Sequence, residues 1–80
     1  MRSQSLVTLY ASNNSITSIS GLYGCIKLKT LNVDNNFIKE ISMVILYMNS
    51  LTDFSFTGNP ITDNSAYIKW KDNKGEIYNG

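Results

Sequence analysis

Apolar and polar residues recur along this chain in one fixed order. The order is Leu-x-x-Leu-x-apolar-x-x-Asn-x-Ile, and the third copy has phenylalanine at its second and third apolar positions. Each leading leucine follows the previous one by 22 and then 23 residues, and the asparagines keep the same steps. The copies occupy residues 6–16, 28–38 and 51–61. Matching positions that stay in register over three copies indicate a structural repeat.

Within each copy the apolar residues alternate with polar ones. Leu9 and Ala11 are two positions apart and therefore point to one face of an extended segment, while Thr8 and Tyr10 point to the other. The alternation recurs in residues 28–34 and 51–57. It predicts three short parallel strands about 4.8 Å apart, in a sheet that is buried on its apolar face only. The polar positions on the opposite face are Thr8, Tyr10, Ser12, Thr30, Asn32, Asp34, Asp53, Ser55 and Thr57.

The asparagine of each copy, Asn14, Asn36 or Asn59, stands where the chain must leave its strand. Buried backbone groups at such a turn need hydrogen-bond partners. An asparagine side chain has both an acceptor and a donor group, so it can bridge backbone groups of its own turn and of the next copy. We interpret these asparagines as a structural ladder rather than as ligand-binding residues.

The segments between the strands predict short helical turns. Ile41, Val44, Ile45 and Met48 are spaced by three and four residues, which suits one or two turns of helix. The first copy has two glycines in the same stretch, so a looser 3-10 turn is expected there. The extra residue of the second copy fits a fuller helix, and its apolar run from Met43 to Met48 is expected to fill the core.

This pattern resembles the leucine-rich repeat, whose period is about 20–29 residues. The short period is similar to that of the intracellular class that includes regulators of protein phosphatase 1 and ciliary and dynein-associated proteins. The resemblance implies an α/β solenoid of about three repeats, with a parallel sheet on the concave face and helical or 3-10 segments on the convex face. It divides the chain into residues 1–5, an extension without a cap; repeats at 6–27, 28–50 and 51–61 onward; and a cap at 62–80.

The end of the chain resembles the C-terminal cap of intracellular leucine-rich repeat proteins. In that cap Asn-Pro-apolar precedes a tyrosine and a basic residue, which here correspond to residues 59–61, Tyr67 and Lys69. Asp or Asn near residue 63 can begin a helix. We expect Tyr67, Ile68 and Trp70 to cover the apolar edge of the last repeat. The apolar segment that closes the family's cap is only loosely matched by residues 75–80, and its usual proline is missing.

Charge and residue types narrow the function. Seven basic and six acidic residues give a net charge of +1, so no strong field favours nucleic acid or an anionic membrane. The chain has no histidine, and the spacing places its one cysteine, Cys25, in the core, where burial makes a thiol inert. We therefore expect no enzyme activity, metal, cofactor or small-molecule substrate. A lone cysteine also favours a reducing, cytoplasmic location.

Two functions of different classes remain. The first is a non-catalytic scaffold that binds a protein partner through the concave face, with Tyr10 as its aromatic anchor. The alternative is that this face is only a solvated strand surface that binds nothing. Its two acids, Asp34 and Asp53, stand at different positions of their copies and need not be close to each other. The second function is a structural subunit of a large assembly, docked through an N-terminal repeat edge that lacks a cap. The resemblance makes a cytoskeletal or axonemal assembly, and a ciliary location, part of that second expectation.

Two further questions stay open at the level of sequence. Only five residues precede Leu6, so either the chain is a fragment of a longer array or another polypeptide covers this edge. Phe37 follows the ladder asparagine of the second copy. Its ring is either an exposed apolar contact or lies tucked under the next loop.

Overall fold

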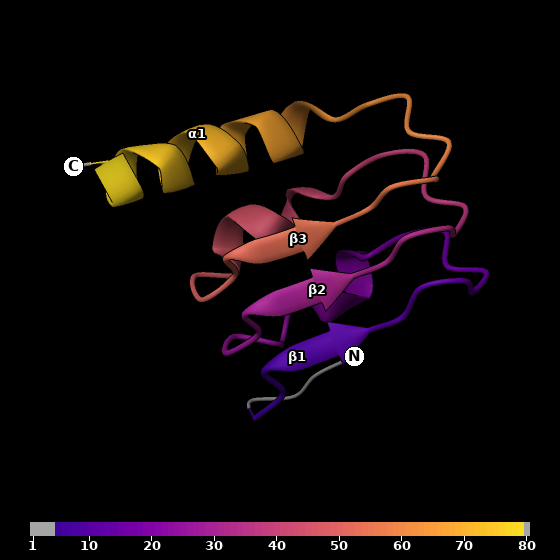
Figure 1. Ribbon diagram of the computed structural model, residues 1–80, viewed down its shortest axis with the longest axis horizontal. Helices are drawn as coiled ribbons and strands as arrows, with labels where there is room; N and C mark the ends of the chain where they lie inside the picture. The colour runs from indigo at the N-terminus through magenta and orange to yellow at the C-terminus, as the bar shows by residue number, and fades with distance from the viewer. Residues whose placement is uncertain (1–4, 80) are drawn as a thin grey trace.

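The computed structural model describes residues 5–79, with side chains described as far as Asp72. Short strands and 3-10 turns alternate, and one long helix follows them (Figure 1). The strands lie in one layer with the 3-10 turns behind them, and the helix lies beyond the last strand. The elements are β1 (Thr8–Tyr10), η1 (Ser20–Leu22), β2 (Thr30–Asn32), η2 (Met43–Tyr47), β3 (Asp53–Ser55) and α1 (Ser65–Asn79).

The sheet of the described residues is parallel and runs in the order β1-β2-β3. Thr8 lies beside Thr30, and Thr30 lies beside Asp53. Each of these residues is two positions after the leading leucine of its copy. The predicted parallel strands and their register are therefore confirmed, because equivalent positions of the motif stand side by side.

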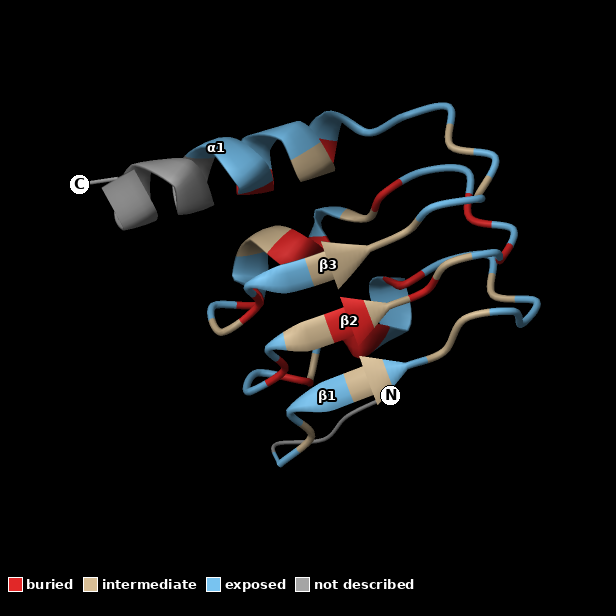
Figure 2. Cartoon of the chain, in the orientation of Figure 1, coloured by how far each residue is buried: buried red, intermediate tan, exposed pale blue. Residues whose placement is uncertain are grey.

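The core lies between the sheet and the two 3-10 turns, and its burial is uneven along the stack (Figure 2). In the second copy the apolar residues of the motif, Leu28, Leu31, Val33 and Ile38, are fully buried, because a neighbouring copy covers them on each side. Their equivalents in the first copy, Leu6, Leu9, Ala11 and Ile16, are only partly buried. The buried apolar residues are Ile19, Leu22, Cys25, Leu28, Leu31, Val33, Ile38, Ile41, Val44, Ile45, Met48, Leu51, Ala66 and Trp70.

The buried side chain of Asn36 joins the first two copies. Its Oδ1 accepts hydrogen bonds from the backbone N–H groups of Asn14 (3.1 Å) and Ile16 (3.0 Å). Its Nδ2 donates to the backbone oxygens of Ala11 (3.0 Å) and Val33 (2.8 Å). One amide thus satisfies backbone groups of two turns, as the ladder interpretation predicts.

The other two asparagines show how the ladder extends and where it stops. Oδ1 of Asn59 accepts from Ile38 N–H at 3.0 Å, and its Nδ2 donates to Val33 O at 3.0 Å, so it joins the third copy to the second. Asn14 is exposed and its Nδ2 donates to carbonyl oxygens of its own copy. Each bridging asparagine therefore links its turn to the copy that precedes it.

The residue before each ladder asparagine adopts a left-handed backbone conformation, which the sequence interpretation missed. Asn13, Asn35 and Gly58 have φ angles of 59°, 57° and 77°. Asparagine and glycine tolerate this region better than other residues. At Gly58 a Cβ atom would also collide with the side-chain oxygen of Asn35. The dipeptides Asn-Asn and Gly-Asn that recur at this place in the sequence are the signal that would have found these turns.

The segment behind β2 and β3 differs from the helix predicted for it. η2 is a five-residue 3-10 turn, begun by Ser42, whose Oγ accepts from Val44 N–H at 3.2 Å. Such a turn directs Val44 and Ile45 into the core. Met43 and Tyr47, which belong to the run expected to fill the core, are exposed instead. The looser turn predicted for the first copy is confirmed as the three-residue η1.

α1 covers the last copy, and one of the three predicted cap residues does not contribute. Ala66 and Trp70 are buried and four residues apart, so they lie on one face of the helix. Tyr67 is half-buried beside them. The prediction for Ile68 was wrong, because its position between those residues turns it outward and leaves it exposed. A separate closing segment was expected at residues 75–80. Instead α1 continues to Asn79, so residues 75–79 belong to this helix.

An aspartate holds the start of α1, as predicted. Oδ1 of Asp63 accepts from the backbone N–H of Ser65 at 3.0 Å and from its hydroxyl at 2.8 Å. These two hydrogen bonds favour the ionised carboxylate and lower the pKa of Asp63 below its ordinary value of 3.8, the backbone bond having the larger effect.

Replacing Asn36 by Ala should destabilise the protein far more than replacing Asn14 by Ala. Asn36→Ala leaves several backbone groups of two turns without partners, at about 1–3 kcal/mol for each buried one, whereas Asn14→Ala should cost about 1 kcal/mol. Urea unfolding followed by circular dichroism measures both. Equal losses for the two variants would contradict the ladder.

Replacing Asp63 by Ala should lower the melting temperature at neutral pH. A carboxylate with a lowered folded-state pKa stabilises the fold fully above its ordinary value of 3.8, and this stabilisation is lost as the pH falls through the lower folded-state pKa. The difference from the native chain should therefore shrink in acid. Asp72→Ala, at an exposed acid further along α1, is the control. A difference that persists unchanged in acid would show that the cap does not act through its charge.

Candidate interaction surface

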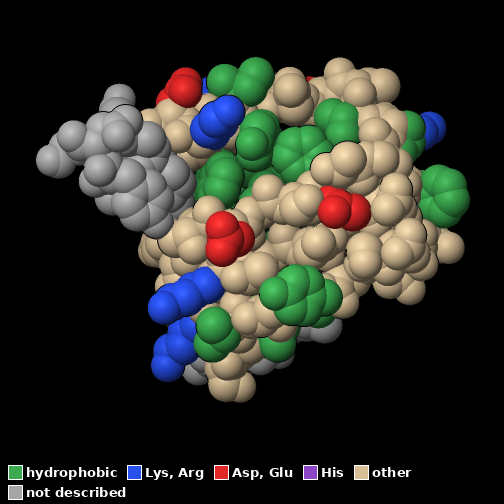
Figure 3. Space-filling model, in the orientation of Figure 1, with side chains coloured by type: hydrophobic (Ala, Val, Ile, Leu, Met, Phe, Trp, Pro, Cys, Tyr) green, Lys and Arg blue, Asp and Glu red, His purple; other side chains and the backbone are tan. Residues whose placement is uncertain are grey.

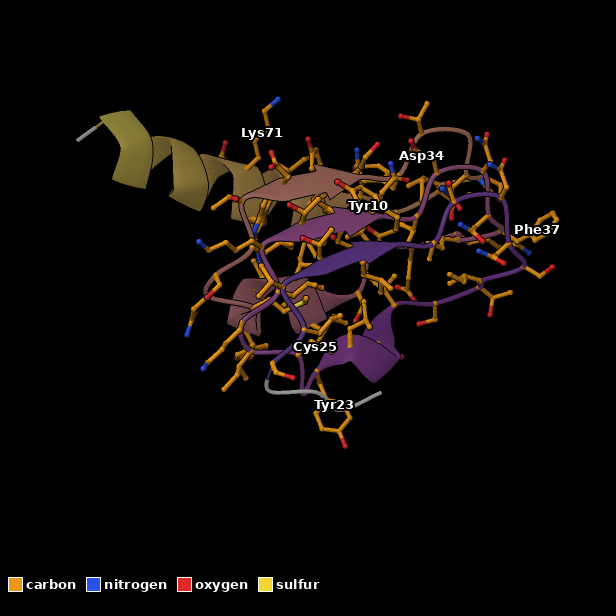
Figure 4. All side chains as sticks on the ribbon, turned by 60° about the horizontal axis from the view of Figure 1, so that its bottom comes forward. Tyr10, Tyr23, Cys25, Asp34, Phe37 and Lys71 are labelled. Atoms are coloured by element: carbon orange, nitrogen blue, oxygen red, sulfur yellow. The ribbon has the colours of Figure 1, made fainter. Side chains whose placement is uncertain are left out.

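We call the nine polar residues predicted for one face of the sheet the outer sheet face, and the six of them that lie in strands stand side by side in register. Tyr10 and Asp34 project to the same side of the sheet, opposite to Cys25 (Figure 4). Because the strands pair in register, these residues form rows across the sheet, such as Tyr10, Asn32 and Ser55. The face is a platform of short polar side chains with one large aromatic ring.

Four of these residues are joined by hydrogen bonds. Oδ1 of Asp34 accepts from Ser55 Oγ at 2.6 Å and from Thr57 N–H at 2.7 Å. The backbone N–H of Asp34 donates to Oδ1 of Asn32 at 3.0 Å. The carboxylate of Asp34 therefore fastens the end of β2 to β3, so we assign it a positioning role. As expected, Asp34 and Asp53 do not pair, since Asp53 lies beside Thr30.

Tyr10 and Asp53 are the large or charged side chains of this face that remain available for contact. Tyr10 is 73% exposed, and its neighbours in the same row are shorter polar residues. Thr8 and Thr57 are exposed as well, while Ser12 and Thr30 are half-buried. An aromatic ring that stands above small polar groups on a strand is a suitable anchor for a protein partner.

A groove beside β3 was missed by the sequence analysis. It is a cavity of about 370 Å³ lined by Phe54, Ser55, Phe56, Thr57, Gly58, Asn59, Ile61 and Tyr67. Hydrophobic side chains gather at the surface between α1 and β3 (Figure 3). The motif assigned the two phenylalanines to the core, yet both are only half-buried. The presence of phenylalanine at both positions, where the other copies have leucine, valine or alanine, was the available signal.

Phe37 and Cys25 lie outside both of these surfaces. The ring of Phe37 is exposed, which settles the open question in favour of an exposed apolar residue, and its N–H donates to Ile16 O at 2.8 Å. Cys25 is fully buried, as its spacing predicts.

Among the described residues no group of His, Cys, Asp or Glu side chains could hold a metal ion. In the same part of the chain no helix has the length and apolar character needed to cross a membrane.

Comparisons with known proteins identify the family. Residues 4–69 match the family described as Leucine Rich repeats (2 copies). Over 67 residues the chain is 33% identical to Leucine-rich repeat- and IQ domain-containing protein 1 of Mus musculus, a match that covers 80% of this chain and 4% of the length of that protein. No solved structure matches. Domains of this family generally mediate protein–protein interactions and are typically non-catalytic. The chain, with its in-register parallel strands and asparagine turns, belongs to the leucine-rich repeat family.

Proposed function

We propose that this protein is a non-catalytic scaffold that binds a protein partner through the outer sheet face, which we take as the concave face of a short solenoid. The observation that carries the proposal is Tyr10, an aromatic side chain 73% exposed on a strand whose neighbours in register are short and polar. Tyrosine is enriched among the residues that dominate interface energies, because its ring offers a large contact area together with a hydroxyl.

The network around Asp34 supports the same proposal. A surface that binds a partner without rearranging loses less entropy on association than a mobile one. Asp34, Ser55 and Thr57 are fixed to one another by hydrogen bonds of 2.6 and 2.7 Å. A partner would therefore meet a rigid platform, with Tyr10 and Asp53 as the side chains that distinguish it from other polar surfaces.

A specific observation also favours the second candidate, a structural subunit docked through the edge beyond β1. A cavity of about 240 Å³ lies on that side, lined mostly by apolar residues of the first copy that include the half-buried Leu9, Ala11 and Ile16. Another repeat or chain placed there would bury these residues as fully as their equivalents in the second copy. A cytoplasmic location is part of both proposals, whereas membership of a cytoskeletal or axonemal assembly belongs to the second alone.

Tyr10→Ala should abolish the capture of a partner protein from cell extract, whereas Tyr47→Ala should not. The two tyrosines are matched in exposure at 73% and 74%, but Tyr47 lies in η2, on the side of the core opposite the sheet. Loss of a central aromatic anchor costs about 2 kcal/mol or more, which weakens binding roughly 30-fold. Quantitative mass spectrometry of the captured proteins measures the effect. A partner that is retained by Tyr10→Ala and lost with Tyr47→Ala would refute the outer sheet face as the site.

Ser18→Arg tests the structural subunit. Ser18 is exposed and lines the cavity beyond β1, so a long charged side chain there should block docking without entering the core. We expect the tagged variant to leave the high-mass fraction of a native cell extract on size-exclusion chromatography, while Tyr10→Ala stays in it. Its melting temperature is the control for folding. Retention of Ser18→Arg in a large complex from which Tyr10→Ala is lost would refute this second candidate.

A further inference from the structure

The edge of β3 that faces away from β2 has backbone groups without partners. Asp53 N–H donates to Lys29 O at 3.0 Å, and Ser55 O accepts from Val33 N–H at 2.9 Å. Backbone groups of a strand point alternately to its two sides, so those of Phe54 and Phe56 point away from β2. Within the described residues, Phe54 N–H, Phe54 C=O and Phe56 N–H make no hydrogen bond.

α1 does not close this edge. The helix packs against η2, behind the sheet, and its axis runs beyond β3 with a space between the two ribbons (Figure 1). Aromatic side chains occupy the floor of that space: the ring centres of Phe56 and Tyr67 are 4.7 Å apart, and those of Phe54 and Trp70 are 6.0 Å apart. Above them lies the groove of about 370 Å³, which continues onto the outer sheet face at Ser55 and Thr57.

The aromatic floor contains one further unsatisfied group. Nε1 of Trp70 is buried and has no hydrogen-bond partner among the described residues. Buried donors of this kind are rare in proteins, because an unmade hydrogen bond costs free energy. Together with the three backbone groups of Phe54 and Phe56, it adds an unpaired donor at this end of the described structure.

We propose that an extended segment of a partner protein adds to the edge of β3 as a further strand, in the groove between β3 and α1, and places an apolar side chain on the Phe54–Phe56–Tyr67 floor. This inference rests on the proposed function, for which it specifies the mode of recognition. A peptide backbone has alternating donors and acceptors that can pair with the unpaired groups of this edge, and addition of a strand to an exposed sheet edge is an established way for proteins to bind peptides.

The dimensions and charges of the groove favour one extended chain over other occupants. A volume of about 370 Å³ is small for a folded element and large enough for one or two side chains of a peptide. An exposed acid, Asp53, stands on β3, and an exposed base, Lys71, stands on α1 and projects to the side of the outer sheet face (Figure 4). The groove therefore does not select by net charge, so backbone pairing and the apolar side chain would determine what binds.

The test begins with peptides selected on the purified full chain from a phage-displayed library of random sequences. Binding of a selected peptide is measured from the fluorescence of Trp70, the single tryptophan of the chain, which packs against Phe54. Amide hydrogen exchange is then followed by NMR. We expect Phe54 N–H and Phe56 N–H to exchange rapidly in the free chain and to become protected when the peptide binds.

Two matched controls separate strand addition from other modes of binding. Thr57→Phe should fill the groove and weaken binding about tenfold or more, whereas Thr17→Phe, at an exposed threonine outside both the groove and the outer sheet face, should leave it unchanged. In an added strand only every second peptide N–H faces the edge of β3. N-methylation of those amides should therefore weaken binding roughly tenfold because it removes hydrogen bonds to the edge, whereas N-methylation of the alternate amides should leave binding unchanged. Melting temperatures confirm that both variants fold.

Every other outcome overturns the strand-addition proposal. If the amides of Phe54 and Phe56 remain unprotected while Tyr10→Ala abolishes binding, the peptide lies on the outer sheet face, and the proposed function stands without the groove. If the two amides become protected in the chain alone as its concentration rises, a second copy occupies the edge. If no selected peptide binds at up to about 1 mM, the groove is not a peptide site, and the comparison of Tyr10→Ala with Tyr47→Ala decides the proposed function separately.

Discussion

The arrangement of this protein depends on the hydrogen bonds that one side-chain amide, that of Asn36, makes to two successive turns. After each strand the chain turns away from the sheet, and the backbone groups on the buried side of that turn need hydrogen-bond partners within the protein. Asn36 accepts from Asn14 and Ile16 and donates to Ala11 and Val33, so the turn of one copy is fixed to the turn of the next. Stacked turns hold the strands in register, and strands in register give the sheet one buried and one polar face.

The stacking explains why the properties of the two edges differ from those of the middle. In the second copy each apolar side chain of the motif has neighbours on both sides and is buried. Beyond β1 the apolar residues are half-buried around a cavity, and beyond β3 the phenylalanines form an aromatic floor under a groove. Such a stack offers a partner two kinds of surface, a face made of side chains and an edge made of unpaired backbone groups. We propose one contact on each, at Tyr10 on the face and at Phe54 with Phe56 on the edge.

The sequence predicted the parts of the fold that follow from spacing. Steps of 22 and 23 residues placed Thr8, Thr30 and Asp53 side by side, and the asparagines at their bridging positions. It did not predict features that depend on the direction of a side chain within a turn or helix. Met43 and Ile68 are apolar residues in apolar neighbourhoods, yet the geometry of η2 and of α1 turns them outward. The role of Asp34 was missed for a similar reason, because its bonds to Ser55 and Thr57 join residues more than twenty positions apart.

The most direct test of the central claim observes the bridging hydrogen bonds themselves. Scalar couplings across hydrogen bonds, measured by NMR on isotope-labelled protein, would connect the backbone nitrogen of Ile16 to the side-chain carbonyl carbon of Asn36, and that of Ile38 to the side-chain carbonyl carbon of Asn59. If the asparagines hold the turns together, both couplings should be observed. The coupling across the sheet hydrogen bond from Ala11 N–H to Asn32 O serves as the internal standard. If the sheet coupling is seen and neither side-chain coupling appears, the asparagines do not hold the turns together, and the strands must be kept in register by their apolar packing alone.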